Sequence, residues 1–93
     1  MVWKVLRMNV IDMHCDTIAQ IYRAQNQKET QRLLSNNLCV DLQKMKQGGY
    51  LLQNFAMFVD KGEEENPLET ALGMIDCYYQ ELNENNDWIA PVF

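Results

Sequence analysis

Alternating polar and apolar side chains predict a β-strand over residues 8–14. The polar residues at every second position are Asp12, His14 and Asp16, and the residues between them are Ile11, Met13 and Cys15. Because successive side chains of a strand point to opposite faces, the carboxylates and the imidazole are expected on one face and the apolar side chains on the other. One face can then pack against the protein while the other carries chemistry.

Helical periodicity and end signals predict three helices after this strand. The first begins at Thr17, directly after the polar triplet. Asp41 is a good N-cap for a short helix over 42–47, which Gly48 and Gly49 can end. Asn66 and Pro67 are typical start signals for a third helix, which is expected to end near Asn83. The apolar positions of this last helix, which are expected to share its buried face, are Leu68, Ala71, Leu72, Ile75, Tyr78, Tyr79 and Leu82.

A second strand is predicted over Tyr50–Val59, where apolar and aromatic residues are nearly continuous. Such a run is typical of a parallel strand that is covered on both faces. The resulting order of strand, two helices, strand and helix predicts an α/β protein with parallel strands joined by right-handed crossovers. The acidic residues 63–65 after the second strand are expected to form a solvated loop.

Composition limits the function classes that fit this chain. The 93 residues are 47% hydrophobic and 23% charged, which is ordinary for one small globular domain. No apolar run approaches the roughly 18 residues of a membrane span, and residues 1–7 are too short and too charged for a signal peptide. We therefore expect a cytoplasmic protein without a membrane partner, in which residues 1–7 are a leader or a wrongly assigned start and residues 8–93 form the fold.

Net charge and cysteine spacing exclude two further classes. The net charge is −5 and the 8 basic residues are scattered, so no nucleic-acid partner is expected. The 3 cysteines lack zinc-finger spacing and are expected to be reduced thiols. Cys15, which alternation directs away from His14, is predicted to be a packing residue.

His14 and Asp16 are the candidate metal ligands. Their Cα atoms are roughly 6.6 Å apart in an extended strand, close enough for both side chains to reach one divalent ion. An imidazole with a carboxylate suits zinc, and the carboxyl end of a strand before a helix is the functional edge of βα folds. The alternative is a partly buried histidine beside solvated carboxylates, and the pattern alone leaves it open.

The sequence resembles the renal or membrane dipeptidase family of zinc peptidases. Residues 10–17, Val-Ile-Asp-Met-His-Cys-Asp-Thr, resemble the opening metal motif of that family. Val40-Asp41-Leu42, Gly48-Gly49 and the strand with Gln53 resemble its second characteristic block, and the helix from Pro67 falls where the family has one. The resemblance extends from Met8 to about Leu82.

The resemblance implies a (β/α)8 TIM-type barrel with two zinc ions and a dipeptide substrate. It assigns His14 and Asp16 as ligands of one ion and gives Asp12 a supporting role. The family's bridging glutamate and its two further histidine ligands have no counterpart here, since His14 is the only histidine. A barrel of this type takes about 250 residues, so this chain is expected to be its N-terminal portion, with no catalytic residue, at most one partial zinc site and no activity alone.

Two other functions are compatible with the same residues. A non-catalytic remnant could act as an oligomerising or binding module, because exposed strand edges favour association into a homo-oligomer. Another barrel metallohydrolase could begin with a similar histidine and aspartate pair. The block around Gly48, Gly49 and Gln53 favours the dipeptidase over the latter.

Overall fold

The computed structural model describes residues 9–60, 62 and 66–92. Along the chain the elements are β1 (Val10–Cys15), α1 (Thr17–Asn26), α2 (Leu42–Gly48), β2 (Tyr50–Phe55) and α3 (Pro67–Glu84). The leader predicted at residues 1–7 and the acidic loop predicted at 63–65 lie outside the described residues.

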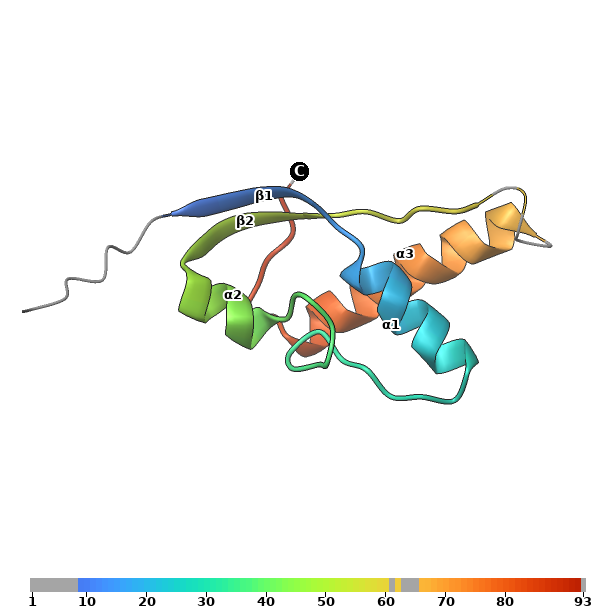
Figure 1. Ribbon diagram of the computed structural model, residues 1–93, viewed down its shortest axis with the longest axis horizontal. Helices are drawn as coiled ribbons and strands as arrows, with labels where there is room; N and C mark the ends of the chain where they lie inside the picture. The colour runs from blue at the N-terminus through green and yellow to red at the C-terminus, as the bar shows by residue number, and fades with distance from the viewer. Residues whose placement is uncertain (1–8, 61, 63–65, 93) are drawn as a thin grey trace, which may run out of the picture.

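The two strands form one parallel pair, which confirms the α/β class. α1 and α2 lie between β1 and β2 in the sequence, so the connection is a helical crossover, as parallel pairing requires. Figure 1 shows the helices on one side of the strand pair. The carboxyl ends of β1 and β2 therefore lie next to each other, and α1 leaves directly from the end of β1.

Local sequence signals position α2 as predicted. The Asp41 carboxylate accepts a hydrogen bond from the Lys44 backbone nitrogen at 2.8 Å, which is an N-cap contact. Gly49 has a φ of 73°, a left-handed conformation that ends the helix and that glycine adopts without strain. The chain then enters β2 at Tyr50.

α3 also begins as predicted. The Asn66 side chain accepts a hydrogen bond from the Glu69 nitrogen at 3.1 Å, and Pro67 occupies the first turn. The helix ends at Glu84, one residue beyond the expected Asn83.

The buried face of α3 differs from the predicted one. Leu68, Leu72, Ile75 and Tyr79, all expected in the core, are exposed. Of the predicted positions, Leu82 is buried, and the helix buries it together with Met74, Cys77 and Glu81. The two faces are about one residue position apart around the helix, or ~100°. The shift arises because α3 packs on α1 and on the loop that carries Arg32. Arg32 pairs with the buried Glu81 carboxylate, and a pattern of apolar residues could not include that position.

β2 is shorter and more exposed than predicted. It ends at Phe55 rather than Val59, and it is not covered on both faces, since Leu51 is 67% exposed. The physical reason is that β1 is its only strand neighbour in the described part of the chain and the helices lie on one side.

The core lies between α1, α2, α3 and the connecting loop. Its buried cluster consists of Ile18, Ile21, Leu33, Leu42, Met45 and Cys77. Leu33 comes from a segment with no helix or strand, and its backbone nitrogen donates to the buried Glu81 carboxylate at 3.2 Å. Among the helices of the described residues, none combines the length and apolar character that a bilayer crossing needs.

Candidate metal site

A register shift in β1 shapes the site. Asp12 lies opposite Gln53 and Cys15 lies opposite Phe55, so three steps along β1 match two steps along β2. The extra residue interrupts strict alternation, as β-bulges do. Asp12, His14 and Asp16 were predicted to share one face through strict alternation. The register shift breaks that alternation between Asp12 and Cys15. Cys15 is buried, as expected for a packing residue, whereas Ile11 and Met13, predicted to share its packing face, are 58% and 65% exposed.

Asp16 occupies the turn between β1 and α1 rather than a strand position. It is the N-cap residue of α1, but its side chain makes no capping hydrogen bond. Instead, Asp16 Oδ1 lies 3.3 Å from His14 Nε2. The two side chains that the sequence selected as ligands are therefore brought together at the carboxyl end of β1.

The separation within this pair is that of a histidine–carboxylate ion pair, and it is also compatible with two ligands of one divalent ion. Two ligand atoms about 2.0–2.1 Å from a tetrahedral zinc ion are roughly 3.3 Å apart. The observed separation of Nε2 and Oδ1 is 3.3 Å, and the two side chains are 67% and 51% exposed. An ion could therefore approach both atoms from solvent without rearrangement of buried groups.

Asp12 contacts the backbone beside the pair. Its Oδ1 accepts a hydrogen bond from the His14 backbone nitrogen at 3.2 Å. The backbone oxygen of Asp12 in turn accepts from Gln53 Nε2 at 3.4 Å, which links this part of β1 to β2. Asp12 is thus placed to fix the backbone that carries the imidazole.

A third ligand is not provided by the described residues. Within residues 9–60, 62 and 66–92, no group of three or more histidine, cysteine or acidic side chains could hold a metal ion. A catalytic zinc ion has three protein ligands and an open position for water. His14 and Asp16 would therefore form part of a site.

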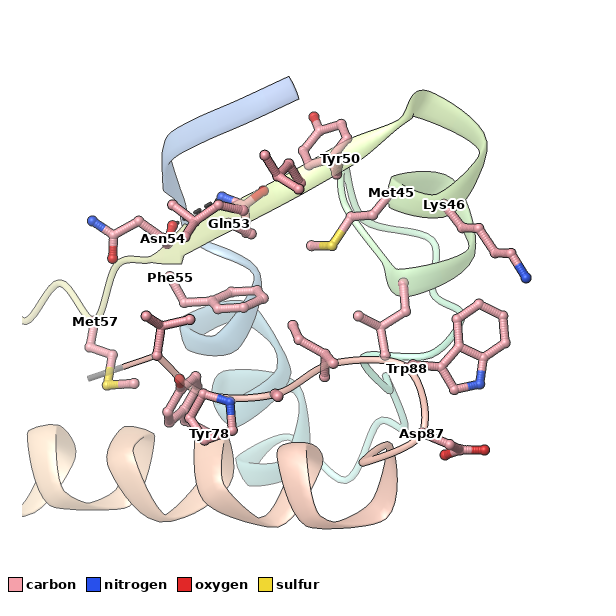
Figure 2. A pocket seen from close by; sticks show the side chains of 17 residues that line it. Met45, Lys46, Tyr50, Gln53, Asn54, Phe55, Met57, Tyr78, Asp87 and Trp88 are labelled. Atoms are coloured by element: carbon pink, nitrogen blue, oxygen red, sulfur yellow. Dashed lines mark hydrogen bonds between the residues drawn. The ribbon is translucent and has the colours of Figure 1, made fainter. Parts of the chain in front are cut away.

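The structure also contains a groove that the sequence did not indicate. It has a volume of about 860 Å³ and lies between α2, β2 and residues 87–92. Figure 2 shows Phe55 and Tyr78 on one part of its wall and Trp88 beside Lys46 on another. Lys46 Nζ is 5.2 Å from the centre of the Trp88 ring, within cation–π range. Segments far apart in sequence form this groove, so no local motif could have predicted it.

Sequence reasoning did not predict the burial of two polar groups, the Glu81 carboxylate and the side-chain oxygen of Gln53. Glu81 is 2% exposed and pairs with Arg32. Gln53 has a buried Oε1 atom without a hydrogen-bond partner in the described structure. Glutamate and glutamine usually lie at the surface, so composition gives no signal for either position.

Comparison of the chain with models of known protein families, with curated proteins and with solved structures gives no match.

Proposed function

We propose that this chain is the N-terminal part of a zinc-dependent dipeptidase with a (β/α)8 barrel. The observation that carries the proposal is the 3.3 Å approach of His14 Nε2 and Asp16 Oδ1 at the carboxyl end of a parallel strand. This is the edge at which barrel enzymes place their catalytic groups. The resemblance of residues 10–17 and of the Gly48–Gln53 block to the dipeptidase family supports the choice of reaction.

In this proposal His14 and Asp16 hold one zinc ion, and Asp12 fixes the backbone of His14. A bound zinc ion supplies a water of lowered pKa and polarises the carbonyl of a dipeptide. The chain contributes no catalytic residue of its own, and the remaining ligands come from further strands of the barrel. A reducing, cytoplasmic setting is part of the proposal, because Cys15, Cys39 and Cys77 are all free.

Exposed apolar surface supports the barrel part of the proposal. Ile11 and Met13 on β1 are 58% and 65% exposed, and Leu51 on β2 is 67% exposed. Further strands and helices of a barrel would bury such positions, because parallel sheets are normally covered on both faces. The exposed face of α3, formed by Leu68, Leu72, Ile75 and Tyr79, would be covered in the same way.

The same exposed residues favour one alternative, a non-catalytic module that associates through its open strand edges. A third candidate, another barrel metallohydrolase, would keep the metal pair and change the substrate. The two barrel hypotheses differ in the substrate-binding residues of later strands, whereas the binding module needs no such residues.

The coding sequence beyond Phe93 tests the proposal. We expect an in-frame continuation with Glu-Gly at the end of a third strand and two later histidines. A continuation that lacks these ligands would refute the dipeptidase.

Assay of the purified 93-residue chain with zinc and a panel of dipeptides gives a second test. The chain supplies too few ligands, so no turnover is expected, and turnover that depends on His14 would contradict the account.

A further inference from the structure

Four apolar side chains form an exposed stripe along α3. Leu68, Leu72, Ile75 and Tyr79 follow one another at intervals of four, three and four residues, which places them on one face of the helix. Their exposed fractions run from 41% for Ile75 to 69% for Leu68. Because each residue turns the helix by about 100°, the stripe lies on the side of α3 away from Cys77, which packs in the core shared with α1. The stripe is thus open to solvent in the described part of the chain.

The charged side chains of α3 are all negative. The helix contains no lysine or arginine, and the exposed Glu69 and Asp76 lie seven residues apart along one border of the stripe. Asp76 accepts a hydrogen bond from the Gln80 amide at 3.0 Å, but among the described residues neither carboxylate forms an ion pair. The other two acidic side chains of α3 both pair with Arg32. Two negative charges therefore remain uncompensated beside an apolar surface.

We propose that the exposed stripe of α3 is a docking surface for a basic amphipathic helix of a partner protein. The apolar face of such a helix would cover the four apolar side chains, and its lysine or arginine side chains would pair with Glu69 and Asp76. Burial of the stripe supplies affinity. The two carboxylates select the sign of the partner's charge.

Charge makes a second copy of this chain an unsuitable occupant. Each copy carries a net charge of −5, and pairing of two α3 helices would bring Glu69 and Asp76 of both copies together. Like charges across an interface oppose association. The inference does not rest on the dipeptidase proposal, and the arrangement that competes with it is a longer chain whose own later elements cover α3.

Fluorescence anisotropy tests the surface on the untagged 93-residue chain. The probe is a labelled synthetic helix of about 18 residues, the length of α3, with leucines at the same spacing as the stripe and lysines beside them. We expect it to bind at least about tenfold more tightly than a twin peptide in which glutamate replaces each lysine. Added salt should reduce this difference, because it screens the charges.

Variants locate the binding surface. Leu72→Gln and Ile75→Gln should each weaken binding of the lysine peptide by about tenfold, and circular dichroism checks that both still fold. Leu51→Gln changes an apolar side chain on β2 that is 67% exposed, and this matched control should bind like the unchanged chain. Glu69→Gln combined with Asp76→Asn should bring the affinities for the two peptides closer together.

Three results with the 93-residue chain would overturn the proposal. They are equal affinity for the two peptides, binding that survives both Leu72→Gln and Ile75→Gln, and a dimer of the chain alone that Leu72→Gln prevents. If the natural chain is longer, its failure to bind the lysine peptide would also overturn the proposal, because its own elements would then cover α3. The dipeptidase proposal is tested separately, by the ligands encoded after Phe93.

Discussion

Arg32 Nε lies 3.1 Å from Glu81 Oε1, and this ion pair fastens the loop between α1 and α2 to the buried face of α3. The Glu81 side chain is 2% exposed, and its other oxygen accepts from the Leu33 backbone nitrogen. Asn85 Nδ2 also donates to the Glu81 backbone oxygen at 2.8 Å. The same guanidinium pairs with Glu84, whose side chain is 56% exposed.

The two glutamates should therefore differ in their contribution to stability. Glu81→Ala removes the acceptor of the Leu33 backbone nitrogen and leaves that buried N–H without a partner, so it should lower the free energy of unfolding by about 1–3 kcal/mol. Glu84→Ala is the matched control and should cost less than about 1 kcal/mol, because exposed pairs contribute little. Urea unfolding measures both values. Equal losses of stability in Glu81→Ala and Glu84→Ala would contradict a larger contribution from the buried glutamate.

The Tyr22 ring of α1 lies against Gly73 of α3. A Cβ atom at Gly73 would lie 2.5 Å from Tyr22 Cε2, which is too close for two carbon atoms. Gly73→Ala should therefore destabilise the protein by about 1 kcal/mol, although alanine is the better helix former. In a Tyr22→Ala background the same change should stabilise by up to about 1 kcal/mol. Thermal unfolding of the four proteins tests this change of sign, and stabilisation in both backgrounds would contradict the contact.

The three free cysteines should react differently in the folded protein. Burial raises the pKa of the Cys77 thiol to about 11, assisted by the nearby Glu81 charge. Burial also raises the pKa of Cys15, despite hydrogen bonding with Thr17. Cys39 is exposed. Because the thiolate is the reactive form, iodoacetamide at neutral pH should modify Cys39 alone.

Mass spectrometry measures this selectivity. One adduct is expected on the native chain and three on the chain unfolded in urea. Cys39→Ser should give no native adduct. Rapid native modification of Cys77 would contradict the buried face of α3.

Asp41 should make the fold sensitive to acid. Burial acts to raise the pKa of Asp41, but hydrogen bonds from the Lys44 and Asn36 backbone nitrogens and the Lys44 charge outweigh burial and lower it. Because the folded pKa is below the unfolded value of about 4, this stabilisation is complete above pH 4 and is lost as the pH falls through the folded pKa.

Asp41→Asn tests the sign of this effect. At neutral pH the variant should be less stable by about 1 kcal/mol, because its amide can replace the cap but not accept from both backbone nitrogens as the carboxylate does. The difference should shrink as the pH falls below about 4. A stability difference that stays constant from neutral to acidic pH would contradict the ionised role of Asp41.

Much of the fold follows from local signals in the sequence. The Asp41 cap, the left-handed Gly49 and the Asn66 start signal involve residues at most a few positions apart, so the sequence suffices to place α2 and the start of α3. The rotation of α3 was not predictable in this way. It depends on Arg32, 49 positions before Glu81 in the chain, which makes a buried glutamate tolerable.

The candidate site shows the same division. The spacing of His14 and Asp16 predicted their approach, and the structure places them 3.3 Å apart. The spacing did not reveal that β1 has a register shift after Asp12, because the register is set by pairing with β2, or that Asp16 lies in the turn before α1 rather than in the strand. Metal binding by His14 and Asp16 remains a prediction from the sequence and from the geometry.

The most direct test of the central claim uses the fact that His14 is the only histidine. Its two imidazole carbon-bound protons give an unambiguous pair of NMR signals in the untagged chain. Titration with Zn²⁺ should shift or broaden these signals, EDTA should restore them, and Asp16→Asn should weaken the response. Imidazole signals that stay unchanged in excess zinc would contradict the assignment of His14 and Asp16 as metal ligands.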